Sequence, residues 1–580
     1  MRRTILLALC LVVVTSQADA KTLYVNAASG SDAVSYAAND ADHPWATLCR
    51  ATNGSSACGS SSTNAAQAAK AGDVVLIASG VYRAPGTGLR FLSPFNPANS
   101  GTATAPITFR CATARACVLA LSASEGPVFG CRSRDYIIWD GFAVDGVISP
   151  STSDTGHVDF FSATGCALLN STISGNPAHP NTGQGNYNAV RLEATREIVL
   201  RGNILSDIAE AGVYGGNQAA VMLYDADDTL IEYNTIARVG NGVYIKGTHD
   251  VPGESQARTT VRANFLYDVR FNCLDTLSAQ GATLTQNICI AGAGGTNGAT
   301  VFGFPPSANV GVQLHSVDYT HNVFIGFTNC FNYEGVGGVA YHRTVRAWNN
   351  ICRTASVGTR SWSLSGPGDT KHEHTLYSDV STAAHFGRPL ALQEWQALGQ
   401  DAALPSAAST SGPLFVAEAP GPSGDFHLAP GSAGATLGRT FAGAVVPVGA
   451  YITGREVIGH LGADGGGAPA PVDCVVSAWA LQSSGPWGAC TAQQQSRVES
   501  WARTILTPAA HGGAACPALT ETRTGTQACA EPDTVTLTCT VSSALAPYAD
   551  GDLKRQIRCN TNGAVMALPR GAAFTVVVPK

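Results

Sequence analysis

Four side chains in the middle of the chain carry the groups that proton abstraction beside a carboxylate requires. That chemistry needs a base, a cation or donor that stabilises the enolate, and a proton for the leaving oxygen. Lys246, Arg270, Tyr224 and His315 offer an amine, a guanidinium, a phenol and an imidazole. Together they would serve β-elimination at a uronate, provided that the fold brings them within a few strands of one another.

A recurring pattern between Cys166 and Cys352 predicts the elements that position them. Seven stretches share an apolar residue, two variable residues, a small polar residue, one variable residue and another apolar residue. The small polar positions, spaced 23 to 35 residues apart, are Ser171, Asn203, Asn234, Asn264, Asn287, Asn322 and Asn350. Such a recurrence is typical of a solenoid, and a short strand and turn in each coil indicates a β-helix. We expect the Asn side chains to point inward and to bond one another and the backbone between coils.

A second set of stretches, among them AVRLEA (189–194), GVYIKG (242–247) and GVQLHS (311–316), alternates along the chain with the first. Because strand side chains alternate between faces, the aligned stretches predict an inward and an outward column. The expected inward column is Leu192, Leu223, Ile245, Asp275, Leu314 and Tyr333. The expected outward column is Glu193, Tyr224, Lys246, Thr276, His315 and Glu334. Parallel coils stack about 4.8 Å apart, so Tyr224, Lys246 and Thr276 would lie side by side on one outer sheet.

Segments along residues 23–453 resemble secreted right-handed parallel β-helix proteins of the pectate lyase-like superfamily. They include LYVNAASGSD (23–32), YIIWDGFAVDG (136–146), GVYIKG and DFHLAPGSAG (425–434). The resemblance implies an all-β, right-handed parallel β-helix and polysaccharide lyase activity, with Lys246 as the base and Arg270 from a neighbouring coil. The ordinary alternative is that Lys246 is a solvated residue of an outer sheet, because GVYIKG recurs in β-helices of several activities.

Other residues near the outer column are further candidates. Arg191 and Glu193 in AVRLEA, and His249 in the loop after Lys246, are expected to contact substrate. Glu193 and Glu334 would lie four rungs or more apart, about 20 Å, whereas a glycosidase pair needs about 5 to 10 Å. Pairing of Glu193 with a neighbouring Asp keeps hydrolysis open as an alternative.

An acidic run follows the strand of Tyr224. Asp225, Asp227 and Asp228 could bind Ca²⁺, and the superfamily resemblance implies that such an ion would neutralise the uronate. Turn formation by Asp explains the same run without a metal. Calcium is thus the one cofactor that the sequence suggests.

The chain begins with two arginines, an apolar run and Ala-Asp-Ala at 18–20, which is typical of a signal peptide over residues 1–20. We therefore expect an extracellular or periplasmic protein. No other run reaches the roughly 18 apolar residues of a membrane span. Removing Arg2, Arg3 and Asp19 from 35 basic and 41 acidic side chains leaves 33 and 40, a net charge of −7. This charge gives no support to nucleic-acid binding.

Sixteen cysteines remain after cleavage, and an even number in an exported chain favours disulfides over metal sites. The pairs closest in sequence, Cys49 with Cys58 and Cys111 with Cys117, are the expected bridges. A short helix at 65–71 is expected to cap the open first coil.

Two further cysteine pairs are separated by whole coils. Cys131 and Cys166 lie about one coil apart and could join neighbouring rungs. Cys289 and Cys352 share a ladder column with one coil between them, roughly 9 to 10 Å, which exceeds the reach of a disulfide. We expect these two to be buried thiols or to pair elsewhere.

The β-helix is expected over 21–460, followed by a linker rich in Gly, Ala and Pro at 461–472. Residues 473–530 then resemble a thrombospondin type 1 repeat, on Trp479, Trp487, Arg497, Arg503 and the GGAACPALTE stretch. The resemblance implies interleaved Trp and Arg side chains and bridges of Cys474 with Cys516 and Cys490 with Cys529. It also implies contact with cell-surface or matrix glycans. Residues 531–580 are expected to form a small β appendage.

These patterns favour a secreted protein that acts on an acidic polysaccharide as a lyase. A glycan-binding or adhesive surface protein without catalysis is the main alternative, because the thrombospondin-like module is a binding module elsewhere. A glycoside hydrolase on the same fold is the second alternative.

Overall fold

A computed structural model describes residues 20–58, 63–84, 93–121, 128–144, 155–175, 187–208, 218–247, 256–277, 279–303, 315–335, 343–361, 370–401, 413–419, 421–441, 444–445, 447–452, 456, 458–459, 475–476, 479–489, 491, 494–503, 505–507, 518–528, 539–547 and 553–559. Residues 1–19 of the expected signal peptide and the whole expected linker lie outside these ranges. The chain divides into two units, Met1–Ala470 and Pro471–Lys580.

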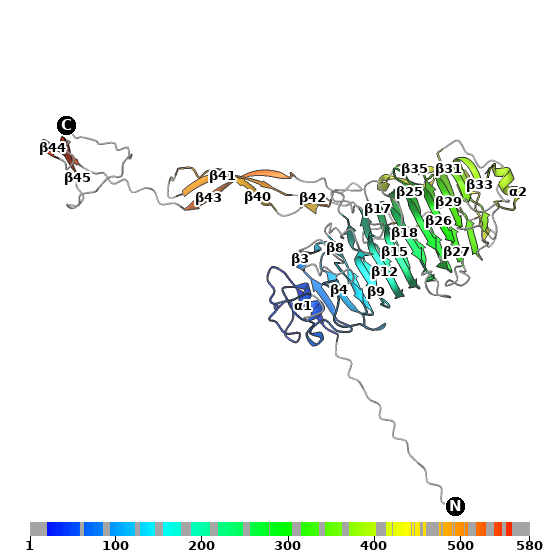
Figure 1. The fold of residues 1–580 in the computed structure, drawn as a ribbon, viewed down its shortest axis with the longest axis horizontal. Coiled ribbons are helices and arrows are strands. Elements are labelled where there is room, and N and C mark those ends of the chain that lie inside the picture. The colour runs from blue at the N-terminus through cyan, green and yellow to red at the C-terminus, as the bar shows by residue number, and fades with distance from the viewer. Residues whose placement is uncertain are drawn as a thin grey trace, which may run out of the picture. The chain divides into compact units, whose positions relative to one another are not determined.

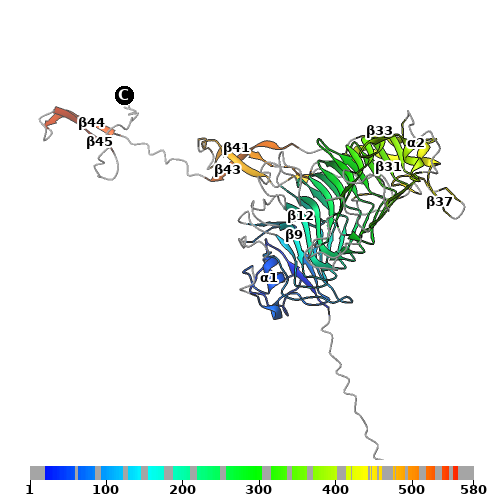
Figure 2. The ribbon, with the colours of Figure 1, turned by 45° about the vertical axis from the view of Figure 1, so that its right-hand side comes forward.

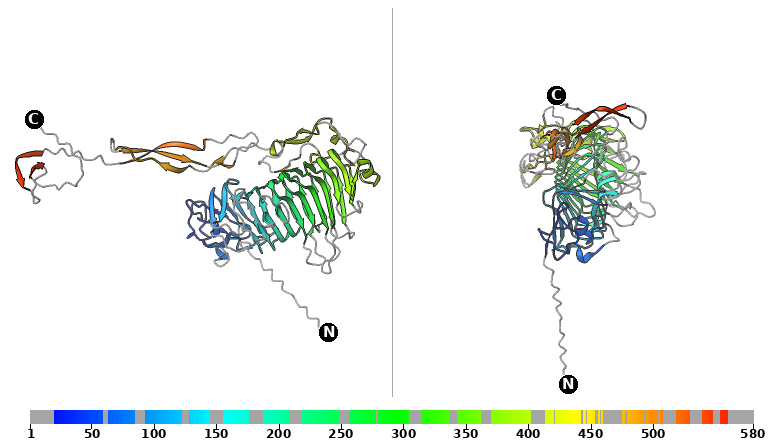
Figure 3. Two further views of the ribbon diagram at one scale, coloured as in Figure 1. Left: turned by 45° about the horizontal axis from the view of Figure 1, so that its top comes forward. Right: turned by 90° about the vertical axis from the view of Figure 1, so that its left-hand side faces the viewer.

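The first unit is a parallel β-helix in which each coil supplies strands to three stacks. Two successive coils show the pattern: β13 (Val199–Arg201), β14 (Ile204–Ser206) and β15 (Ala219–Asp227), then β16 (Leu230–Glu232), β17 (Thr235–Val239) and β18 (Asn241–Lys246). Each strand pairs in parallel with its counterpart in the next coil. Figure 1 and the left panel of Figure 3 show the resulting rungs, stacked from blue to yellow-green. The predicted fold class is confirmed, with three strands per coil where the sequence patterns identified two.

The first stack is a 12-stranded parallel sheet. Besides β13 and β16 it contains β1 (Thr22–Val25), β2 (Val74–Ile77), β4 (Ile107–Cys111), β7 (Ile137–Asp140), β10 (Ala167–Leu169), β20 (Thr260–Arg262), β24 (Ala282–Thr285), β27 (His315–Thr320), β30 (Arg343–Trp348) and β32 (Thr370–Glu373).

The second and third stacks belong to one 20-stranded sheet, because β31 pairs with both β28 and β29. The second stack adds to β14 and β17 the strands β3 (Gly80–Ala84), β5 (Cys117–Leu121), β8 (Phe142–Val144), β11 (Thr172–Ser174), β21 (Phe265–Val269), β25 (Ile288–Ala291), β28 (Val323–Ile325), β31 (Ile351–Ser361) and β33 (Leu376–Phe386). The third stack adds to β15 and β18 the strands β6 (Phe129–Arg132), β9 (Thr155–Phe161), β12 (Tyr187–Arg196), β22 (Asn272–Leu277), β26 (Asn297–Gly303) and β29 (Asn329–Gly335).

A buried Asn ladder runs along the turn between the first and second stacks. The backbone N–H of Asn203 donates to Oδ1 of Asn234 at 2.9 Å, and Nδ2 of Asn203 donates to the same oxygen at 3.0 Å. The pattern repeats from coil to coil as far as Asn350, and its members are fully buried. The predicted inward ladder is therefore confirmed, and it satisfies backbone groups that the turns leave unpaired.

A second, unpredicted Asn ladder marks the start of the third stack. Asn272 donates its backbone N–H to Asn241 Oδ1 at 3.2 Å, and Asn297 and Asn329 continue the chain of bonds through their amides. The two ladders tie both ends of the second stack to neighbouring coils.

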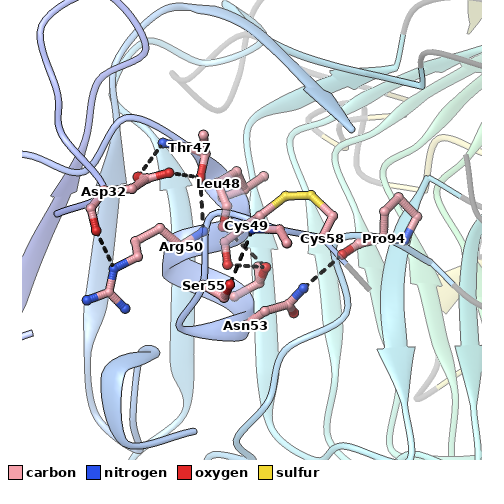
Figure 4. Close-up of a disulfide and its surroundings, with 11 residues drawn as sticks. Asp32, Thr47, Leu48, Cys49, Arg50, Asn53, Ser55, Cys58 and Pro94 are labelled. Atoms are coloured by element: carbon pink, nitrogen blue, oxygen red, sulfur yellow. Dashed lines mark hydrogen bonds between the residues drawn. A yellow bond between two sulfur atoms is a disulfide. The ribbon is translucent and has the colours of Figure 1, made fainter. Parts of the chain in front are cut away.

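The N-terminal end is covered by the helix α1 (Leu48–Asn53), all of whose residues are buried. Thr47 caps it by accepting the backbone N–H of Arg50 at 3.2 Å, while its hydroxyl donates to Asp32 at 2.7 Å, as Figure 4 shows. The expected helix at 65–71 is wrong in extent. Only the 3-10 turn η2 (Ala65–Gln67) forms, because Ala68 already has an extended backbone as the chain enters β2.

Four disulfides are present among the described residues. The expected bridges Cys49–Cys58 and Cys111–Cys117 are confirmed, and Figure 4 shows the first. The others are Cys273–Cys289 and Cys330–Cys352.

The predictions for the two cysteine pairs separated by whole coils differ in outcome. Cys289 and Cys352 are indeed not bonded to each other, and each pairs with a cysteine at the start of the third stack. Cys131 and Cys166 are buried free thiols, so the bridge that could join their rungs is not formed.

The C-terminal part of this unit closes the solenoid. The helix α2 (Leu392–Ala397), preceded by β34 (Pro389–Leu390), buries Trp395 in stacked contact with Phe386, 5.4 Å between ring centroids. Segments β35 (Phe415–Ala417) and β36 (Asp425–Leu428) pack on apolar side chains of the second stack. Figure 2 shows this end in yellow-green, beside short β37 (Thr440–Phe441). Searching the described residues finds no helix long and apolar enough to cross a membrane.

The second unit contains a three-stranded antiparallel sheet of β40 (Ala480–Ser484), β41 (Gln494–Ala502) and β43 (Thr520–Ala528). Shorter antiparallel pairs are β39 (Val475–Val476) with β42 (Ile505–Thr507), and β44 (Cys539–Pro547) with β45 (Leu553–Cys559).

Arginine side chains lie over tryptophan rings along this unit. The guanidinium-to-ring distances are Arg497 to Trp487 4.4 Å, Arg503 to Trp479 4.2 Å, Arg523 to Trp479 5.4 Å and Arg523 to Trp501 4.9 Å. Cys474, Cys490, Cys516 and Cys529 lie outside the described residues.

Candidate functional site

Glu193, Tyr224 and Lys246 are neighbours on three successive strands of the third stack. The register pairs Glu193 with Tyr224 across β12 and β15, and Tyr224 with Lys246 across β15 and β18. Their sequence neighbours Leu192, Leu223 and Ile245 are fully buried in the core, so the three polar side chains lie on the outer face. This part of the predicted column is confirmed.

The predicted register is wrong from the next strand onward. Ile245 pairs with Thr276 and Lys246 with Leu277. Thr276 is therefore inward, where its hydroxyl lies 3.2 Å from the Tyr319 hydroxyl. Asp275 pairs with Tyr244 on the outer face, where Asn272 Nδ2 donates to its carboxylate at 3.1 Å.

The strand that follows in this stack is β26, not the GVQLHS stretch. Phe302 pairs with Leu277, and Glu334 pairs with Phe302. His315 instead begins β27 in the first stack, opposite Arg343, so it does not join the column of Lys246. Leu314 lies outside the described residues. Glu193 and Glu334 are five rungs apart, about 24 Å, and cannot act as a carboxyl pair.

Tyr224 lies between two cations. Lys246, on the following strand, has Nζ 3.4 Å from the Tyr224 hydroxyl and 4.9 Å from the ring centroid. Arg191, on the preceding strand, has its guanidinium carbon 4.4 Å from the same centroid. Both contacts are within the range of cation–π attraction, and both cations would stabilise negative charge on the phenol oxygen.

An ion pair holds Arg191 in this position. Its Nε and Nη2 atoms each lie 3.1 Å from Glu193 Oε2, and the Arg191 side chain is only 6% exposed. Nη1 is buried and has no hydrogen-bond partner in the part of the chain that the structure describes. Two of the three guanidinium nitrogens of Arg191 are therefore held by Glu193, and the third is enclosed.

Asp159 completes the arrangement and escaped the sequence patterns. It lies on β9, paired in register with Arg191, and is 3% exposed. Burial raises the pKa of its carboxyl to about 7, and the charge of Arg191 opposes that rise. The signal was available in HVDFF (157–161), where Asp159 stands between the inward residues Val158 and Phe160, as Arg191 does in AVRLEA.

Arg270 is not brought to Lys246. It precedes β22, whose last residue, Leu277, pairs with Lys246, and the strand alone spans about 16 Å. Its guanidinium lies 3.4 Å from Asp268 instead. Arg191 supplies the nearby guanidinium that the sequence assigned to Arg270. His249 lies outside the described residues.

Two members of the acidic run after Tyr224 face arginines. Asp228 forms a two-bond ion pair with Arg258, at 2.5 and 2.7 Å, which holds the pKa of that carboxyl below its usual value. Asp227 lies 3.7 Å from Arg196. Asp225 and Asp228 have left-handed backbones, φ 47° and 51°, a conformation that Asp tolerates in turns. Among the described residues, no group of three or more His, Cys, Asp or Glu side chains is placed to hold a metal ion.

Comparisons with known proteins find structural likeness alone. No protein-family model and no curated protein matches the chain. Pectate lyase Pel9A matches with a TM-score of 0.42 at 12% identity, covering 75% of this chain and 98% of its own. An exopolygalacturonase from Thermotoga maritima matches with a TM-score of 0.38 at 9% identity, covering 55% and 85%.

A polysaccharide lyase of the PL6 family from Pseudopedobacter saltans has a TM-score of 0.32 at 13% identity, covering 53% of this chain and 81% of its own. At such identities the likeness concerns the parallel β-helix and not the reaction. The function has to be argued from the residues of the outer face.

Proposed function

We propose that the protein binds a polysaccharide and cleaves it as a lyase, by β-elimination at a uronate residue. The observation that carries the proposal is the Tyr224 phenol held between Arg191 and Lys246 on the outer face of the third stack. A base, a proton donor and a cation are the three groups that this reaction requires.

Each group has a defined step. Lys246 Nζ removes the proton from C5, the electrons of that bond form the C4–C5 double bond, and the C4–O bond to the leaving sugar breaks. Tyr224 donates its phenol proton to the leaving oxygen. The charge of Arg191, whose Nε and Nη2 are held by Glu193, stabilises the enolate.

Hydrolysis is the second candidate, because a specific pair of carboxyls favours it. Burial raises the pKa of Asp159 to about 7, a value suited to a general acid at neutral pH. Arg191 is the cross-strand partner of Asp159, and Glu193 lies two residues after Arg191 on the same strand. In that reaction Asp159 would protonate the glycosidic oxygen and Glu193 would act as base or nucleophile.

Further parts of the proposal concern location and attachment. We infer that the protein is exported, which the four disulfides among the described residues support. The interleaved Arg and Trp side chains support a thrombospondin-like second unit that contacts glycans. A glycan-binding protein without catalysis remains the alternative from another class.

A panel of uronate and neutral polysaccharides tests the reaction. A lyase produces unsaturated uronate, detected by its ultraviolet absorbance, whereas a hydrolase produces reducing ends without that absorbance. Each substrate is assayed with and without a chelator, which also decides calcium dependence. Binding with neither product would contradict both enzymatic proposals and support the binding protein.

A further inference from the structure

A set of charged side chains lies along the outer face of the third stack, on the strands before and after that of Tyr224. Three are cationic, Arg132, Arg191 and Lys246, and two are carboxylic, Asp159 and Glu193. They come from β6, β9, β12 and β18, four strands of one stack. We refer to these five residues as the charged cluster.

Asp159 is the unusual member of the charged cluster. Glu193 is 31% exposed and bonded to Arg191, whereas Asp159 is almost fully buried. Arg191 pairs in register with Asp159, yet it gives two of its nitrogens to Glu193. Burial of a carboxylate is costly, and the cost is relieved by taking up a proton.

The effect on a ligand follows from the charge count. When Asp159 is ionised, Arg191 lies between two carboxylates, and an incoming anion meets a nearly compensated guanidinium. When Asp159 is protonated, the charge of the cluster rises by one unit and the repulsion between Asp159 and the anion is removed.

We propose that Asp159 is a specificity-determining residue that couples the binding of an anionic sugar to the uptake of one proton. The inference rests on the proposed function, since it assigns a uronate to this face. It predicts that uronates bind more tightly at lower pH, whereas neutral sugars do not.

Asp159 is the group of the charged cluster whose protonation we expect to change near neutral pH. Burial raises its pKa to about 7, so affinity for an anion falls as pH rises through that value. The other titratable group of β9, His157, has a pKa lowered to about 4 by burial and stays neutral. The charged groups that act on Asp159 are Arg132, Arg191 and Glu193, and Glu193 is paired with Arg191.

Calorimetry on the full chain tests the coupling. The parent carries Tyr224→Phe, which keeps the ring between the cations but removes the proton that cleavage needs. The probes are oligogalacturonate, oligomannuronate and a galactose oligomer of equal length. Binding is measured at about pH 6 and about pH 8.5, and in two buffers of different ionisation enthalpy, so that bound protons are counted.

We expect uronate affinity to fall about tenfold over this range for each unit by which binding raises the pKa of Asp159. Proton uptake should be largest between the free and bound pKa values, about half a proton for a rise of one unit, and the galactose oligomer should show neither effect. Asp159→Asn should bind uronates at both pH values as tightly as the parent does at the lower. Asp318→Asn, which removes an exposed carboxylate of the first stack, should behave like the parent.

The outcomes separate the two proposals. If neither uronate binds at any pH, the proposed function fails and the coupling fails with it. If a uronate binds without proton uptake, or Asp159→Asn keeps the pH dependence, the coupling alone is wrong. Should Asp159→Asn not fold, the proton count of the parent decides.

Discussion

Tyr224 differs from an ordinary surface tyrosine because two cationic side chains contact it. Lys246 contacts its hydroxyl and ring from one strand, and Arg191 covers its ring from another. Such a contact requires side chains from three consecutive rungs, so it depends on the register of the whole stack. A register shifted by one residue would turn all three toward the core.

Lys246→Ala should abolish turnover and leave the fold intact. The side chain lies on the outer face and supports no core packing, whereas loss of a general base typically costs about 10²- to 10⁴-fold in rate. The measurement is unsaturated product per minute together with a thermal melting curve. Lys371→Ala is the matched control, because Lys371 is an exposed lysine of the first stack paired with Glu373. Full activity in Lys246→Ala would place the chemistry elsewhere.

Arg191 and Arg270 should respond differently to substitution. Arg191→Lys keeps the charge but cannot bond Glu193 through two nitrogens while covering the Tyr224 ring, so kcat/KM should fall about 10- to 100-fold. Arg270→Lys should change kcat/KM less than about twofold, because Arg270 lies at the far end of its coil, 3.4 Å from Asp268. The reverse ranking would restore the role that the sequence assigned to Arg270.

Some residues of this site could be predicted from sequence and others could not. Lys246 and Tyr224 were found because their apolar neighbours alternate without interruption. Thr276 was misplaced because Asp275, Thr276 and Leu277 fit either register, and only packing against Tyr319 decides between them. Asp159 was missed because its stretch lies before the repeats that defined the columns.

At the scale of elements, the Asn ladders explain how coils with unequal insertions keep one register. Each buried amide bonds its neighbours above and below, so a coil that slipped would leave several polar groups unpaired. The first ladder was readable because a small polar residue recurs at one place in an apolar pattern. The third strand of each coil and β26 could not be read from the sequence. Both GVQLHS and NGATVFG alternate like strands, and only the length and packing of the rest of the coil decide which of them joins the third stack.

Asn264→Ala should destabilise the β-helix strongly. Asn264 accepts from the backbone and amide of Asn234 and donates to Asn287 and to the Ile231 carbonyl, all buried. Leaving such groups unpaired costs about 1 to 3 kcal/mol each, so a loss of roughly 2 to 5 kcal/mol is expected. The readout is the urea unfolding midpoint. Thr283→Ala, an outward residue of β24, should change stability by less than about 0.5 kcal/mol.

At the scale of the whole molecule, buried histidines make stability depend on pH. Burial lowers the pKa of His372 to about 3, and the pKa values of His157 and His321 to about 4. The unfolded chain takes up these protons below about pH 6.5, whereas the folded chain does not. Stability is therefore full above that pH and falls as pH drops toward 4. Asp401, whose burial raises its pKa to about 6, offsets part of the loss.

His372→Gln should reduce this acid sensitivity. The amide can still bond the Tyr333 hydroxyl, which His372 contacts at 2.8 Å, but it does not titrate. The slope of unfolding free energy against pH between about 4 and 6 reports the protons taken up on unfolding, and that number should fall by about one. His427→Gln is the control, because His427 is partly exposed beside Asp425. An unchanged slope in His372→Gln would mean that His372 is not the source.

The division of the chain into two units predicts separate roles for them. The candidate site lies wholly within Met1–Ala470, and the stacked Arg and Trp side chains wholly within Pro471–Lys580. A protein ending at Ala470 should therefore cleave soluble oligosaccharides at the full-length rate, since every group around Tyr224 is retained. It should be retained less on an insoluble polysaccharide gel if the second unit binds glycans. Trp479→Ala in the full chain, which removes the ring between Arg503 and Arg523, should lower retention in the same way without changing turnover. Equal retention of all three proteins would show that the second unit has another role, and loss of turnover in the shortened protein would show that the site depends on it.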